Sequence, residues 1–199
     1  MDPVLIVYAT REGHTHRIAK HIAEILEADG YASVVADAAN LEGPADFGDI
    51  RCVILAASVH ADHHEDEMVG FVRRYRESLA RRHTAFISVS LTEATAEDPR
   101  RSRKEREEAG WTARQMIEGF FEETGWRAER SYPVAGALLY SRYGRAMRWM
   151  MARIARNAGA DTDTSHDYVY TDWDALDSFA LEFVHKADPT ESNSLTEPA

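Results

Sequence analysis

The chain has 199 residues, of which 44% are hydrophobic and 29% charged, a composition typical of one globular domain and not of a disordered or fibrous protein. Its formal net charge of -11 argues against a surface built mainly to bind nucleic acid, and its one cysteine, Cys52, excludes an intramolecular disulfide. No segment approaches the roughly 20 apolar residues of a membrane-spanning helix, and the start of the chain lacks the basic region of a signal peptide, so we expect a cytoplasmic protein that does not span a membrane.

Short apolar runs alternate with helical patterns along the chain. The first run, residues 4–8, is continuous and rich in β-forming side chains, which predicts a strand buried on both faces of a parallel sheet. Apolar residues at helical spacing predict a helix over residues 13–29, which Gly30 ends. The same patterns predict further strands at residues 32–36, 52–57, 84–89 and 132–138, and further helices at residues 68–79, 111–123 and after Asp172. This repeated alternation predicts a doubly wound, three-layer α/β sandwich with a five-stranded parallel sheet.

Three segments fall outside the alternation. Residues 93–108 are dense in charges of both signs and lack apolar periodicity, so we expect a solvated loop that runs into the next helix. Residues 139–167 are too many for a simple connection between a strand and a helix, so we expect an insertion near the fifth strand with a helix of its own. The polar tail, residues 188–199, is expected to be disordered, which leaves residues 1–187 as the domain.

A polar turn follows the first strand directly. It reads Thr10-Arg11-Glu12-Gly13-His14-Thr15 and leads straight into a helix, so the backbone N–H groups of the helix start and two threonine hydroxyls converge on one point. Such a point suits a phosphate, although an ordinary capped helix start carries the same kinds of residue. The turn is neither a Walker A loop nor the G-x-G-x-x-G loop of dinucleotide-binding domains, which disfavours ATP and NAD. In an open doubly wound sheet, ligands bind at the carboxyl ends of the strands, where this turn is expected to lie.

At this place in a short doubly wound domain, the turn TREGHT resembles the FMN phosphate loop of the flavodoxin superfamily. The resemblance implies a flavodoxin-like fold with FMN bound by Thr10, Arg11, Glu12, Gly13, His14 and Thr15. It also implies that two further loops flank the isoalloxazine ring, the one after strand three with Ser58, Val59 and His60 and the one after strand four with Ser90, Leu91 and Thr92. We expect His60 to lie beside the ring or to donate a proton near flavin N5. Neither loop contains the Tyr or Trp that usually stacks on the flavin in electron-carrier flavodoxins, which disfavours a simple carrier.

Four stretches resemble one branch of this superfamily more closely, the menaquinone-dependent protoporphyrinogen IX dehydrogenases. They are ATREGHT, AASVHADHH, AGALLYSRYGR at residues 135–145 and ADTDTSHDYVYTDW at residues 160–173, and together they span most of residues 1–186. The resemblance implies that FMN takes two electrons at a time from protoporphyrinogen IX, in haem biosynthesis, and passes them to a quinone, menaquinone or ubiquinone, at the membrane face. An NAD(P)H-fed quinone reductase and a flavodoxin-type electron-transfer protein are the alternatives. The oligomeric state stays open, a homo-oligomer included.

The predicted insertion is strongly basic at its start. Residues 141–156 contain five arginines and no acidic residue, although the whole chain carries a charge of -11. On a helix, the methionines at 147, 150 and 151 would share one face with Ile154, and the arginines would share the other with Trp149. This pattern predicts an amphipathic helix on an anionic membrane surface, which would hold the protein at the inner face of the cell membrane; packing of the methionine face on the domain is the alternative. The residues assigned to substrate or membrane are Tyr140, Arg142, Arg145, Arg148 and Trp149, and Arg142 or Arg145 is expected to meet a substrate propionate.

Histidines and carboxylates gather at residues 60–67, and such side chains can bind a divalent metal. A solvated loop followed by a helix start explains them without a metal, because acidic residues in a first helical turn complement the helix dipole. We therefore predict no metal site. Cys52 lies within a predicted buried strand, and we assign it no chemistry.

Overall fold

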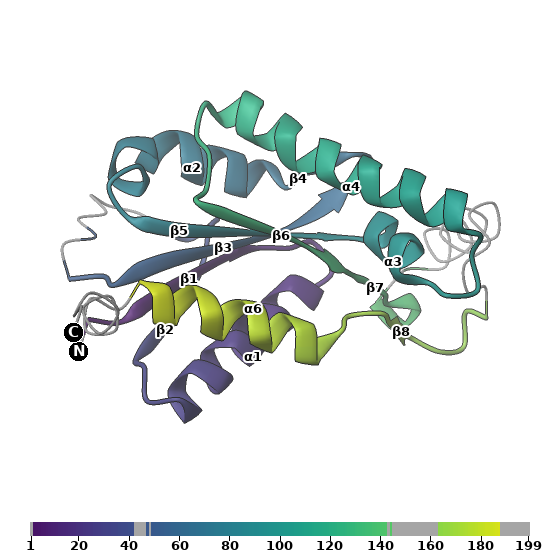
Figure 1. Cartoon of the computed structure of the whole chain (residues 1–199), viewed down its shortest axis with the longest axis horizontal. Helices are drawn as coiled ribbons and strands as arrows, with labels where there is room; N and C mark the ends of the chain where they lie inside the picture. The colour runs from purple at the N-terminus through teal and green to yellow at the C-terminus, as the bar shows by residue number, and fades with distance from the viewer. Residues whose placement is uncertain (1, 42–46, 48, 143, 145–162, 188–199) are drawn as a thin grey trace, which may run out of the picture.

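The computed structural model describes residues 2–41, 47, 49–142, 144 and 163–187. Five strands form a parallel sheet in the order β2-β1-β3-β5-β6, and the short β4 is added antiparallel to β3 (Figure 1). The strands are β1 (Val4–Ala9), β2 (Ser33–Asp37), β3 (Cys52–His60), β4 (His63–His64), β5 (His83–Ser90) and β6 (Arg130–Ala135). Numbered by chain order, the five parallel strands lie as 2-1-3-4-5, the order of flavodoxin-like doubly wound sheets. The predicted fold class is confirmed.

Two pairs of helices cover the two faces of the sheet. α1 (His14–Ala28) and α6 (Trp173–Lys186) lie on one face, and α2 (Asp66–Leu79) and α4 (Arg103–Thr124) lie on the other (Figure 1). Alternate residues of β1 serve the two layers. Val4 and Ile6 pack with α1 and α6, whereas Leu5 and Val7 pack with α2 and α4. The run is continuously apolar because both of its faces are buried, as the sequence predicts.

Cys52, at the start of β3, belongs to the core layer under α1 and α6 and is fully buried. Burial raises the pKa of its thiol to about 12, so the thiol stays protonated at neutral pH. A protonated, buried thiol is a packing residue and not a nucleophile.

The segment at residues 93–108 is mostly helical, so the prediction of a solvated loop is wrong. α3 (Leu91–Glu97) begins directly after β5, where the Ser90 hydroxyl accepts a hydrogen bond from the N–H of Glu93 at 3.1 Å. α4 begins at residue 103 behind a capping box, in which Ser102 and Glu105 accept hydrogen bonds from each other's backbone N–H groups. Caps and i,i+4 ion pairs stabilise these exposed turns without an apolar stripe. The S-x-x-E pattern at residues 102–105 is the sequence signal for this helix start.

The predicted strand at residues 132–138 is divided in two. β6 ends at residue 135, and β7 (Ala137–Leu138) leaves the main sheet to pair antiparallel with β8 (Tyr168–Val169). Gly136 marks the break, because its N–H donates to the Ser90 carbonyl at 2.9 Å and a β-carbon there would lie 3.4 Å from that carbonyl group. β7 and β8 bring the two sides of the predicted insertion together beside α3, at the end of the sheet where β5 finishes (Figure 1).

A 3₁₀ turn (Tyr140–Arg142) follows β7. The predicted amphipathic helix of the insertion and the predicted disordered tail lie outside the described residues. Within the described part of the chain, no helix combines the length and the apolar character needed to cross a membrane.

Candidate functional site

The turn predicted to bind phosphate joins the carboxyl end of β1 to the start of α1. Gly13 caps α1 in a left-handed conformation, with φ of 89°, and its N–H donates to the Thr10 hydroxyl at 3.0 Å. No described side chain caps the first turn of α1, which leaves its N–H groups able to meet an anion. Thr15 is fully buried, and its hydroxyl oxygen has no hydrogen-bond partner among the described residues. A phosphate would satisfy both the backbone donors and this hydroxyl.

His14 holds the start of α1 against the end of β6. Its Nε2 lies 2.8 Å from the Thr171 hydroxyl oxygen, and that hydroxyl donates to the Ala135 carbonyl at 2.6 Å. Because Thr171 has one hydrogen to donate, the His14 Nε2–H must be the donor in their shared bond. Burial, with help from the charge of Arg17, lowers the pKa of His14 to about 4, so the ring is neutral at pH 7. The His14 side chain therefore anchors the loop, and sequence reasoning missed Thr171 because the two residues are 157 positions apart.

A buried carboxylate joins this loop to the next one. Glu65, at the N-terminus of α2, is 4% exposed. One of its oxygens accepts a hydrogen bond from the Ser58 hydroxyl at 2.9 Å, and the other accepts one from the Arg11 guanidinium at 3.1 Å. The two loops that the sequence predicts to lie at the strand ends are thus connected by a residue that sequence reasoning had assigned only to the helix dipole.

His60 lies between two carboxylates at the same edge of the sheet. Its Nε2 is 2.8 Å from a carboxylate oxygen of Glu12 and 3.6 Å from one of Glu65, and its side chain is 32% exposed. The hydrogen bond with Glu12 is the largest influence and raises the pKa of His60 above its ordinary value, while burial works in the opposite direction. His60 therefore borders solvent beside the turn at residues 10–15, and its imidazole keeps a proton to higher pH than an isolated histidine does.

The predicted loop after strand three is a β-hairpin, which corrects the expectation that Ser58, Val59 and His60 lie in a loop. β3 continues through Ser58, Val59 and His60, and Ala61 and Asp62 turn the chain with φ values of 47° and 66°. Two consecutive left-handed residues make a two-residue hairpin turn, whose twist matches that of the paired strands. The strand extends because β4 continues its pairing, which the residue pattern of a single strand does not reveal.

The hairpin separates the histidines that the sequence places together. His63 is exposed, whereas His64 is 5% exposed, packs against Phe86 and Phe120, and lies with Nε2 2.9 Å from the Ser88 hydroxyl oxygen. Burial is the main reason that the pKa of His64 falls to about 3. Across the described ranges, no three His, Cys, Asp or Glu side chains are grouped in a way that could hold a metal ion.

The predicted loop after strand four is the beginning of α3. Ser90 is 5% exposed and its hydroxyl caps that helix, while Thr92 lies half-buried in the first turn. Leu91 packs against a small apolar cluster formed by Leu138 and Tyr140. Tyr140 is fully buried there.

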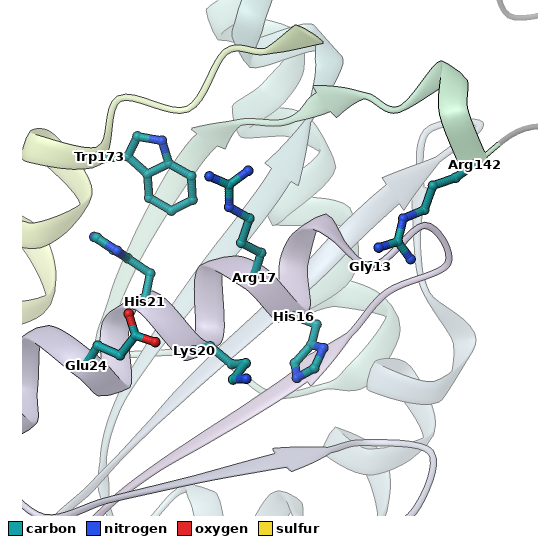
Figure 2. Close-up of a pocket in the computed structure, with 8 residues that line it drawn as sticks. All are labelled: Gly13, His16, Arg17, Lys20, His21, Glu24, Arg142 and Trp173. Atoms are coloured by element: carbon teal, nitrogen blue, oxygen red, sulfur yellow. The ribbon is translucent and has the colours of Figure 1, made fainter. Parts of the chain in front are cut away.

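Arg142 extends from the 3₁₀ turn toward the phosphate loop (Figure 2). A β-carbon built on Gly13 would lie 3.3 Å from Nη1 of Arg142. The two residues border a pocket of about 630 Å³ that continues along the outer face of α1. The other lining residues are His16, Arg17, Lys20, His21, Glu24 and Trp173. Arg145, Arg148 and Trp149, which the sequence assigns to substrate or membrane with Arg142, lie outside the described residues.

Comparisons with known proteins agree with this fold. The model of the flavodoxin domain family matches residues 5–165. Among solved structures, oxidised flavodoxin 2 from Bacillus cereus is similar, with a TM-score of 0.52 and 17% identity over 92% of this chain and 99% of that one. This structural likeness agrees with the fold derived from the strand order.

Two curated proteins are similar along most of the chain. Protoporphyrinogen IX dehydrogenase (quinone) from Escherichia coli strain K12 is 32% identical over 184 residues, covering 92% of this chain and 96% of that protein. The protein of the same name from Leishmania major is 29% identical over 181 residues, covering 90% of this chain and 73% of that protein. The resemblance predicted from the sequence is thereby confirmed. The chain belongs to the flavodoxin domain family and, within it, to the family of the quinone-dependent protoporphyrinogen IX dehydrogenases.

Proposed function

We propose that this chain is an FMN-dependent oxidoreductase that oxidises protoporphyrinogen IX to protoporphyrin IX with a quinone as electron acceptor. The observation that carries the proposal is its similarity, along nearly the whole chain, to the dehydrogenases of that name. Membership of the flavodoxin domain family indicates FMN as the cofactor. The function agrees with the one predicted from the four matching stretches of sequence.

The residues of the turn at 10–15 fit the phosphate of FMN. Thr15 has a buried hydroxyl without a partner among the described residues, and the first turn of α1 has no side-chain cap. When bound, FMN supplies a ring that accepts a pair of electrons from one substrate and passes them to another. We assign the ring to the neighbouring strand ends, with Ser58, Val59 and His60 on one side and Ser90, Leu91 and Thr92 on the other. These segments end the adjacent parallel strands β3 and β5, at the edge where doubly wound sheets bind ligands.

His60 is the proposed proton-holding residue of the reaction. Reduction of a quinone takes up two protons with two electrons, so a side chain that can hold and release a proton near the acceptor would assist the reaction. His60 has a raised pKa, and its Nε2 is held 2.8 Å from Glu12 in the phosphate loop. Because its side chain is 32% exposed, a proton lost to the reaction can be replaced from solvent.

The function is tested by porphyrin fluorescence. The FMN-loaded protein is mixed anaerobically with protoporphyrinogen IX and a menaquinone analogue, and controls omit the protein or the quinone. We expect fluorescence to rise only when protein and quinone are both present, because the electrons removed from the substrate need an acceptor. No rise from a protein that retains its flavin would contradict the proposal.

The same preparation distinguishes the two alternatives. Rapid bleaching of the bound flavin by NADPH, with no oxidation of protoporphyrinogen IX, would identify an NAD(P)H-fed quinone reductase. A stable one-electron-reduced flavin during reductive titration, with no turnover of any substrate, would identify an electron-transfer protein.

We also propose that the basic start of the insertion binds an anionic membrane surface. The proposal is supported by the four arginines of residues 145–156, which no acidic residue in that segment offsets. In sedimentation with vesicles containing phosphatidylserine, Arg148→Glu should lower the membrane partition constant about fivefold or more, since each basic residue near such a surface contributes about 1 kcal/mol. The matched control is Arg81→Glu, an exposed arginine after α2, which should bind as the wild type does. Equal, negligible binding by all three proteins would rule out the membrane proposal.

A further inference from the structure

Arg142 is placed at the phosphate loop by a well-anchored backbone. Its N–H donates to the Leu139 carbonyl at 2.9 Å, which closes the 3₁₀ turn. The preceding residue, Ser141, donates its N–H and its hydroxyl to the two oxygens of Asp167, at 2.8 Å and 2.5 Å. The buried ring of Tyr140 fixes the other side of the turn. The start of the Arg142 side chain is therefore held in place, although the side chain itself is exposed.

The guanidinium of Arg142 is directed at Gly13, the residue that caps the N-terminus of α1 (Figure 2). A β-carbon on Gly13 would lie 3.3 Å from Nη1 and 3.7 Å from Cζ of Arg142, so a side chain at position 13 would crowd the guanidinium. The left-handed φ of Gly13 excludes most side chains for a second reason. Glycine thus keeps open the approach of a cation to the loop.

Charges within the loop itself are already committed. Arg11 pairs with Glu65 at 3.1 Å, and Glu12 pairs with His60 at 2.8 Å. Arg17, one turn along α1, lies with its guanidinium 5.2 Å from the ring centre of Trp173. Arg142, by contrast, pairs with no carboxylate among the residues that the structure describes, and it is the cation that borders Gly13 in the pocket. An anion at the loop would therefore meet backbone N–H donors, the buried hydroxyl of Thr15 and the guanidinium of Arg142, which no described carboxylate neutralises.

We propose that Arg142 is the counterion of the FMN phosphate and determines the preference of this protein for FMN over riboflavin. The inference rests on the proposed function, because it takes FMN as the cofactor. A guanidinium presents paired N–H donors that match the oxygens of a phosphate dianion, and a charged hydrogen bond is stronger than a neutral one. Riboflavin has the same ring and ribityl chain without the phosphate, so Arg142 gives it no advantage. This role differs from the contact with a substrate propionate or a membrane that the sequence suggests for Arg142.

Flavin binding to the apoprotein tests the proposal directly. Dissociation constants for FMN and for riboflavin are measured by quenching of flavin fluorescence, for the wild type, Arg142→Gln, Arg142→Lys and Arg17→Gln. Arg142→Gln should weaken FMN binding about 10- to 100-fold and leave riboflavin binding within about twofold. Arg142→Lys should recover part of the loss, since it restores the charge without the paired donors. Arg17→Gln, the same substitution in the same pocket, should change neither constant more than about twofold.

Each outcome separates this inference from the proposed function. A wild type that binds neither flavin would overturn both. A wild type that binds FMN as tightly as Arg142→Gln would overturn the role of Arg142 alone. Equal losses of FMN and riboflavin binding in Arg142→Gln would indicate a folding defect and contradict a specific counterion. The same loss of FMN binding in Arg17→Gln would indicate that the pocket's positive charge acts in general, which also contradicts it.

Discussion

Replacement of His60 with glutamine is expected to lower kcat/KM for quinone about 100-fold or more at pH 7, with FMN still bound. Glutamine can donate a hydrogen bond to Glu12, so the geometry of the loop is kept, but it cannot hold or release a proton. Loss of a positioned proton donor commonly costs about 10² to 10⁴ in rate. The measurement is steady-state kinetics of the FMN-loaded variant, with His63→Gln as control because His63 lies exposed in the same hairpin.

The pH dependence distinguishes a proton donor from a structural residue. The hydrogen bond with Glu12 is the main cause of the raised pKa of His60. In the wild type, kcat/KM should fall as the pH rises through that raised pKa, because His60 then loses its proton. Glu12→Gln removes the negative charge, so the falling limb should move to lower pH, and in His60→Gln it should vanish. An unchanged limb in both variants would show that another group supplies the proton.

The folded protein is expected to lose about 4 kcal/mol of its free energy of unfolding between pH 7.5 and pH 5 through two buried histidines. His14 and His64 are 6% and 5% exposed, and burial lowers their pKa values to about 4 and about 3. In the unfolded chain both rings take up a proton near pH 6.5, while in the folded protein they stay neutral. Stability is thus complete above pH 6.5 and falls by about 1.4 kcal/mol per pH unit for each histidine below it, until the folded-state pKa is reached.

Urea unfolding at several pH values measures this loss. In His64→Phe the ring packs between the same aromatic neighbours but cannot take up a proton, so the loss between pH 7.5 and pH 5 should shrink by about 2 kcal/mol. At pH 7.5 the variant should also be less stable than the wild type, because the buried hydroxyl of Ser88 loses its partner. His63→Gln, at the exposed neighbouring position, should retain the wild-type loss. A pH dependence unaltered by His64→Phe would refute the assignment.

Elements whose signals are local could be predicted from the sequence. The strand at Val4 and the helix that follows it are encoded by apolar periodicity, and the phosphate turn lies within six consecutive residues, 10–15. The start of α4 has a local signal too, its capping box, but apolar periodicity does not reveal it because this turn is exposed. The division between β6 and β7 was missed for a different reason. It depends on the bond between Gly136 and Ser90, which lie in separate segments.

The connections within the site could not be predicted, because their partners are far apart in the chain. His60 and Glu12 are 48 positions apart, Arg11 and Glu65 are 54 apart, and His14 and Thr171 are 157 apart. Each is an ordinary polar residue in its own segment. Only the parallel order of the strands brings their carboxyl ends, and hence these side chains, to one edge.

The sequence by itself determined the fold class and the family, because periodicity and extended similarity are properties of residues in order. The tertiary structure decided which charges meet. It paired His60 with Glu12, buried Tyr140 and directed Arg142 at Gly13. The physical reason is that the pKa of a histidine and the ion pairing of a guanidinium depend on burial and on nearby charges. Burial and nearby charges are set by neighbours in space and not in sequence.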